Sequence, residues 1–246
     1  MTNSIEVRGL CKSYGDFSLR DIDLTVPGGT IMGLIGENGA GKTTLMKCIL
    51  GLLRHGGAVT LDGEPVTPKN IARLSFATCE HSYFPALTAG AHRGFYRDHF
   101  PKFREKRFHA LMDFFQLPMN KAVRSLSTGQ RNQFEVILAL SQGADYILMD
   151  EPFAGNDVFN REDFYKVLLG ILEPTETVLL STHLLEEVQH FIGRAVLLHR
   201  GRVAGDVTTL ELEEQGRSLM DFVKETYQYR ADRVIRALND LTDKEE

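Results

Sequence analysis

Short apolar runs separated by helix-length segments organise most of the chain. Ile22, Leu24 and Val26 alternate with polar residues, which is typical of a strand with one face in solvent. After a turn at residues 27–29, the run 31–35 is almost continuously apolar, as expected for a strand buried on both faces. Similar runs recur at residues 146–149, 178–180 and 195–198. The pattern therefore predicts an α/β core whose parallel sheet is connected by crossover helices.

The middle of the chain, about residues 84–142, has a different pattern. It contains no strand-like alternation, and helical spacing is found at residues 88–98, 104–115 and 128–142. This segment predicts a helical subdomain inserted into the α/β core. Beyond Gly205 the composition becomes polar, with a further helical stretch at 219–227. We therefore predict one domain over residues 1–206, followed by a short helical C-terminal extension over 207–246.

Composition and charge narrow the possible partners. The net charge of −5 and the pI near 5.9 argue against a large nucleic-acid face, so no nucleic-acid partner is expected. No stretch approaches the roughly 18 apolar residues that span a bilayer, and no signal peptide is visible. Cys11, Cys48 and Cys79 lack metal-ligand spacing and indicate buried, reduced thiols of a cytosolic protein. Work at a membrane would therefore need another chain to cross it.

A glycine-rich loop lies between the apolar run 31–35 and a helical segment that starts near Lys42. It fits the pattern G-x-x-x-x-G-K-[ST] of phosphate-binding loops. Its glycines let the backbone aim N–H groups at phosphate oxygens, and the helix N-terminus adds partial positive charge. Lys42 would neutralise the β and γ phosphates, and the Thr43 hydroxyl would ligate Mg²⁺. The predicted phosphate site comprises Gly36, Glu37, Asn38, Gly39, Ala40, Gly41, Lys42, Thr43 and Thr44. A kinase, a GTPase or another P-loop enzyme could carry this loop.

Two carboxylates end the apolar run 146–149. Asp150 at a strand tip suits the second Mg²⁺ contact of a P-loop enzyme. Glu151 points the other way along a strand and could polarise an attacking water.

Between the two motifs lies Leu126-Ser127-Thr128-Gly129-Gln130, and a Ser181-Thr182-His183 sequence follows the run 178–180. With these motifs in this order, residues 4–206 resemble the ATP-binding subunits of ABC transporters, whose signature peptide is L-S-G-G-Q. The resemblance implies a P-loop NTPase core with a mainly parallel sheet, an N-terminal antiparallel β subdomain and the inserted helical subdomain. It implies ATP and Mg²⁺ as ligands and ATP hydrolysis as the activity. Kinases and GTPases lack this combination.

The resemblance also assigns residues. Tyr14 would stack on adenine, Glu151 would act as general base, and His183 would bind the γ-phosphate. The signature residues Ser127, Thr128, Gly129 and Gln130 would complete the site of a second ATP-binding subunit, in a homodimer or heterodimer.

Some positions depart from the family pattern. Thr128 replaces the first signature glycine, and Glu80 stands where many members carry a glutamine that touches Mg²⁺. Because a carboxylate also ligates Mg²⁺, Glu80 is assigned to the metal site with Thr43 and Asp150. Phe153, Asn156 and Val158 replace residues common in the loop after the catalytic glutamate.

The implied function is the energy subunit of a transporter, at the cytoplasmic face of the membrane and bound to a separate integral membrane permease. Residues 83–96 are predicted to form the transmission face toward that permease. The Y-F-P-A-L-T segment after Glu80 and the short C-terminal extension favour export of a peptide, drug or antibiotic. The alternative is a non-transport ATPase of the same family. One cassette argues against translation factors, and the absence of heptads argues against repair ATPases. Cluster-assembly factors share these motifs.

Overall fold

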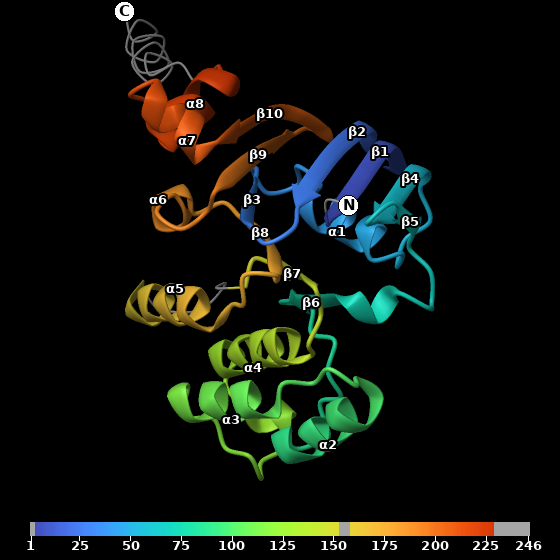
Figure 1. The fold of residues 1–246 in the computed structure, drawn as a ribbon, viewed down its shortest axis with the longest axis vertical. Coiled ribbons are helices and arrows are strands. Elements are labelled where there is room, and N and C mark those ends of the chain that lie inside the picture. The colour runs from blue at the N-terminus through green and yellow to red at the C-terminus, as the bar shows by residue number, and fades with distance from the viewer. Residues whose placement is uncertain (1–2, 153–157, 229–246) are drawn as a thin grey trace, which may run out of the picture.

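A six-stranded sheet forms the centre of the protein (Figure 1). The computed structural model describes residues 3–152 and 158–228. Within them, the strand order is β10 (Arg202–Thr208), β9 (Arg194–His199), β3 (Ile31–Ile35), β8 (Thr177–Thr182), β7 (Tyr146–Asp150) and β6 (Leu74–Thr78). The strands from β9 to β6 run parallel, and β10 joins one edge antiparallel to β9. The prediction of a mainly parallel sheet is confirmed.

The central strands β3, β7 and β8 are buried at almost every position because both faces of the sheet are covered. Leu34, Leu148 and Leu179 pack into a cluster with Leu45 of α1 (Lys42–Ile49). Their chain neighbours, such as Ile35, face the other side and pack into a second cluster with α4 (Thr128–Ser141). Two-sided burial explains why these runs lack the alternation of a half-exposed strand.

A separate antiparallel sheet covers α1 from the side opposite the central sheet. Its strands lie in the order β2 (Phe17–Pro27), β1 (Ser4–Tyr14), β4 (Gly56–Leu61) and β5 (Glu64–Pro65). Ile22, Leu24 and Val26 point inward into the cluster shared with α1, and the residues between them face outward or are half-buried. A 3₁₀ turn, η1 (Ile71–Arg73), leads from this sheet to β6.

The middle segment is helical, as predicted, and forms one end of the molecule (Figure 1). It contains α2 (Ala89–His99), α3 (Glu105–Phe114), the 3₁₀ turn η2 (Val123–Ser125) and α4. Phe108 and Phe134 are fully buried between these helices. Arg107 donates two hydrogen bonds to Glu176, at 2.8 and 2.9 Å, and so ties α3 to the segment that precedes β8.

The remaining helices of the described chain follow β7, β8 and β10. They are α5 (Val158–Ile171), α6 (Leu185–Val188), α7 (Thr209–Glu214) and α8 (Leu219–Thr226). α7 and α8 lie beside β10 at the end of the molecule away from α2 and α3 (Figure 1), and Leu212, Leu219 and Val223 belong to the same cluster as the sheet. The predicted boundary at residue 206 falls inside β10.

The sequence led us to expect that the three cysteines are buried and that no segment spans a membrane. Of the cysteines, only Cys48 is buried; Cys11 and Cys79 are free and exposed, so the expectation of three buried thiols is wrong. In the described part of the chain, no helix has the length and hydropathy that crossing a bilayer requires.

Candidate nucleotide-binding site

The topology brings three loops together at the carboxyl edge of the central sheet. β3, β8 and β7 are parallel neighbours, with Ile35 beside Thr182 and Asp150 beside Ser181. The carboxyl ends of these strands therefore meet, and the residues that follow them converge. The phosphate loop follows β3, Glu151 follows β7 and His183 follows β8. Sites in open α/β sheets form at this edge.

The phosphate loop needs glycine at two close approaches. A Cβ on Gly36 would lie 2.5 Å from the Leu198 carbonyl oxygen. Gly41 has φ +109°, and a Cβ there would lie 2.6 Å from the Phe17 ring. The loop closes on the Lys42 ammonium, which donates to the Gly36 carbonyl at 2.6 Å. The N-terminus of α1 thereby faces the hollow, where its free N–H groups favour an anion.

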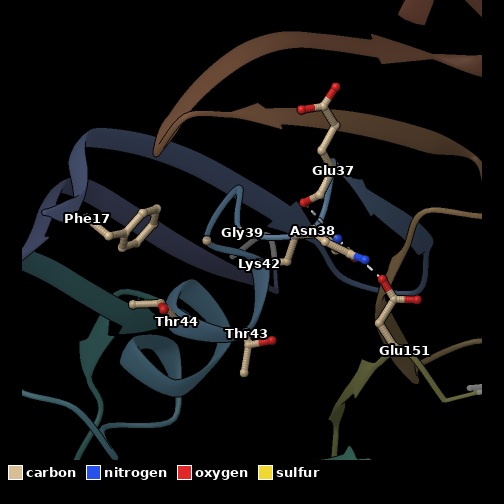
Figure 2. A pocket seen from close by; sticks show the side chains of 9 residues that line it. Phe17, Glu37, Asn38, Gly39, Lys42, Thr43, Thr44 and Glu151 are labelled. Carbon is tan, nitrogen blue, oxygen red and sulfur yellow. Dashed lines mark hydrogen bonds and ion pairs between the residues drawn. The ribbon is translucent and has the colours of Figure 1, made fainter. Parts of the chain in front are cut away.

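The loop lines a hollow of about 410 Å³ (Figure 2). Its lining residues are Phe17, Glu37, Asn38, Gly39, Gly41, Lys42, Thr43, Thr44 and Glu151. A cationic side chain, backbone N–H groups and one aromatic ring in a single hollow suit a nucleoside triphosphate.

The aromatic residue in this hollow is Phe17, whereas the sequence predicted Tyr14. The two residues pair across the turn between β1 and β2. Tyr14 is exposed, and the Lys12 ammonium lies 4.8 Å from the centre of its ring. The sequence signal for Phe17 was the two-residue turn Gly15–Asp16, which places both aromatics at the same end of the hairpin.

Two of the three predicted magnesium ligands are in contact. The Thr43 hydroxyl donates to Asp150 Oδ2 at 2.5 Å, and the Ser181 hydroxyl donates to Asp150 Oδ1 at 2.5 Å. A hydroxyl and a buried carboxylate at the edge of the phosphate hollow are the hard oxygen ligands that Mg²⁺ takes, so these residues fit the ion. Glu80 differs: its carboxylate pairs with the Lys47 ammonium of α1 at 2.6 Å. The structure does not bring Glu80 into contact with the other two.

Glu151 lies between two basic groups. Its Oε1 is 3.3 Å from the Lys42 ammonium, the pair joined by a dashed line in Figure 2, and its Oε2 is 2.9 Å from His183 Nδ1. Glu151 has a left-handed backbone, φ +47°, and its N–H donates to the Ser181 carbonyl oxygen and hydroxyl at 3.1 Å. This turn at the end of β7 aims the carboxylate at the hollow, where it could orient a water molecule.

The predicted signature residues lie elsewhere. Ser127 and Gln130 form a capping box at the start of α4, in which the Ser127 hydroxyl accepts from the Gln130 N–H at 3.2 Å. The Thr128 hydroxyl accepts from Arg131, also at 3.2 Å. Ser127 and Thr128 are exposed, Gly129 is half-buried, and none of the four lines the hollow. Residues 153–157, which include Phe153 and Asn156, are outside the described residues.

Comparison with known proteins connects this geometry to a family. A family model described as ABC transporter matches residues 19–154. The chain is 29% identical over 216 residues to the ABC transporter ATP-binding protein YtrB of Bacillus subtilis (strain 168), covering 86% of this chain and 74% of YtrB. It is 33% identical over 212 residues to Nod factor export ATP-binding protein I of Cupriavidus pinatubonensis, covering 82% of this chain and 65% of that protein. The solved structure of an ATP binding subunit of an ABC transporter superposes with a TM-score of 0.81 and 25% identity, over 91% and 99% of the two chains.

Proposed function

We propose, from the premise that the chain belongs to the ABC transporter family, that its hydrolysis of ATP drives transport through a separate membrane permease. The observation that supports this most is the meeting of the phosphate loop, Asp150, Glu151 and His183 at one edge of the sheet. In this reading the chain works as a peripheral subunit at the cytoplasmic face of the membrane.

The site residues divide the chemistry between them. Lys42 and the N-terminus of α1 hold the triphosphate. Thr43 and Asp150 would hold Mg²⁺, which supplies positive charge to the phosphate oxygens when bound. Glu151 orients the attacking water and accepts its proton. His183, 2.9 Å away, keeps the carboxylate in place.

A second ATP-binding subunit completes the site in this proposal. The signature residues 127–130 start α4 but do not line the hollow of their own chain. Since Ser127 and Gly129 follow the family pattern, they would contact the γ-phosphate held by a partner subunit. The isolated chain should therefore bind ATP and turn it over slowly.

We assign to Phe17 the role of stacking on the adenine base of ATP. Replacing Phe17 with Ala is expected to weaken ATP binding by about 1–3 kcal/mol, because base–aromatic stacking has this magnitude. Tyr14→Ala, at the position paired with Phe17 in the same hairpin, is the matched control and should change affinity less. Titration calorimetry with ATP and with inorganic triphosphate measures both variants. Triphosphate affinity should stay unchanged, because it has no base. A larger loss in Tyr14→Ala would return the assignment to Tyr14.

The face toward the permease is assigned to residues 83–96. Phe84 is 52% exposed, and its ring packs on His92 and Phe95 beneath it. An exposed aromatic ring such as Phe84, packed on other rings, forms an apolar patch that can bind an apolar segment of a partner.

Phe84→Asp tests this face together with the proposed function. We expect the variant to bind ATP normally and to lose both copurification with an integral membrane permease and ATP-driven transport in vesicles. Phe114→Asp is the matched control, because Phe114 is 47% exposed on α3 outside the proposed face. Full transport by Phe84→Asp would refute the assignment.

Export is the proposed direction. Relatives of the chain carry both export and import names, so the proposal rests on the Y-F-P-A-L-T segment after Glu80. The alternative, a cluster-assembly ATPase, would copurify with no permease. Substrate accumulation in inside-out vesicles containing both proteins distinguishes export from import.

A further inference from the structure

A short segment, residues 79–84, connects the catalytic core with the helical part of the chain. It leaves β6 beside β7, whose end carries Asp150, and leads toward α2. Polar side-chain contacts tie it to α1 and to α4. Glu80 pairs with Lys47 of α1, and Ser82 bonds to Glu135 of α4. The segment is thus attached both to the helix that starts at the phosphate loop and to the helix that starts at the signature.

The contact between Ser82 and Glu135 is short and buried. Glu135 Oε1 accepts from the Ser82 N–H at 2.9 Å and from the Ser82 hydroxyl at 2.5 Å. Glu135 is only 1% exposed. Among the side chains that the structure describes, no Lys, Arg or His forms an ion pair with it. A carboxylate without a cation is costly to bury, and a well-packed apolar residue would avoid that cost. What the carboxyl group adds over an apolar residue is an acceptor for the two hydrogen bonds from Ser82.

We propose that Glu135 is a positioning residue for ATP hydrolysis, which fixes the signature peptide relative to the segment 79–84 by holding Ser82. α4 is a continuous helix of 14 residues, and Glu135 lies about two turns after Ser127. A helix of this length moves as a rigid body, so the position of Glu135 determines that of Ser127 and Gly129. The inference rests on the proposed role of the signature at a partner's γ-phosphate, but not on transport.

The protonation state of Glu135 determines how strong its hydrogen bonds with Ser82 are. Burial raises the pKa of Glu135 to about 7, while the bonds from Ser82 and the backbone of Thr78 oppose that rise. The titratable groups around Glu135 are Tyr83, Tyr96, Cys79 and Glu151. Arg131, which lies on α4 like Glu135, places its positive charge near Tyr83. The neutral acid still accepts from Ser82. The carboxylate accepts more strongly, because a charged acceptor roughly doubles a hydrogen bond.

Glu135→Gln separates positioning from packing, since glutamine has the same shape and keeps one carbonyl oxygen for Ser82. We expect its kcat to match that of the wild type near pH 6, where Glu135 is protonated. Near pH 8 its kcat should be about fivefold lower, the difference between a charged and a neutral hydrogen bond. Its Kd for ATP should be unchanged at both pH values. Both measurements use the full chain without a permease, so a failure of the transport proposal would not affect them.

Ser82→Ala and Glu135→Ala complete the test as a double-mutant cycle. Each should lower kcat at pH 8 without changing the Kd for ATP, and the double variant should be no slower than Glu135→Ala. Three results would overturn the proposal: additive losses, a Kd that rises as much as kcat falls, or a ratio of wild type to Glu135→Gln that is equal at pH 6 and pH 8. Thermal unfolding at both pH values confirms that each variant is folded. The wild type itself should lose stability as the pH rises from 4.5 to about 7, because the pKa of Glu135 in the folded state lies above its ordinary value of 4.5.

Discussion

Replacing Glu151 with Gln is expected to leave ATP binding intact and to lower turnover by roughly 10²–10⁴-fold, the usual contribution of a general base. Glutamine keeps the shape of the side chain and can still contact His183. It cannot accept a proton from water, and it removes the negative charge 3.3 Å from the Lys42 ammonium. Ground-state binding should therefore hold or tighten, because Lys42 no longer has a competing anion within the hollow.

Single-turnover phosphate release, with ATP affinity measured in parallel, checks this prediction. Glu64→Gln is the matched control, since it makes the same change of charge on the exposed strand β5. Gel filtration with ATP adds a second readout. If the signature of one chain closes on ATP bound to another, the slow variant should accumulate as a dimer. Wild-type phosphate release by Glu151→Gln would mean that another group activates the water.

The parts of this site that sequence predicts well are those fixed by the backbone. The run 31–35 and the glycine-rich loop after it were predictable from the local sequence, because a continuous apolar run indicates a strand buried on both faces and the loop matches a phosphate-binding pattern. The contact between Thr43 and Asp150 was predictable for the same reason. Parallel neighbouring strands end at one edge, so the residues that follow them must meet.

Other parts of the site depend on which side chain reaches across a tertiary contact, and these need the fold. Tyr14 and Phe17 are two aromatics at the end of one hairpin, and only the packing of β2 against the phosphate loop places Phe17 over Gly41. Glu80 was assigned to the metal by its position in the chain, but the lysine that pairs with it is 33 residues away on α1.

Glu135 gave no signal at all in the sequence. It lies within an otherwise apolar stretch of the helical pattern, where a single acid reads as an exposed residue. Its partner Ser82 is 53 residues away. Only the fold shows that α4 turns this position toward the segment 79–84, and that the acid is buried.

Replacing Lys42 with Ala is expected to weaken ATP binding by about 3 kcal/mol, or roughly 100-fold, because truncating a buried charged partner of a phosphate has this order of effect. Lys42 is buried at the base of the hollow, so little solvent screens its charge from the triphosphate. The substitution also removes the bond to the Gly36 carbonyl that closes the loop, and it leaves the Glu151 carboxylate without the cation 3.3 Å away. Both changes act against an anionic ligand, the first by loosening the loop and the second by exposing an unbalanced negative charge.

These contributions are separable with two variants. Lys69→Ala removes an exposed lysine outside the site and should leave affinity unchanged. In Lys42→Ala/Glu151→Gln, the unbalanced carboxylate is gone, so part of the lost affinity should return if that charge repels the phosphates. Equal ATP affinity of the single and double variants would assign the whole loss to the missing ammonium and the loosened loop. Unchanged ATP affinity of Lys42→Ala, measured by titration calorimetry, would show that the triphosphate does not occupy this hollow.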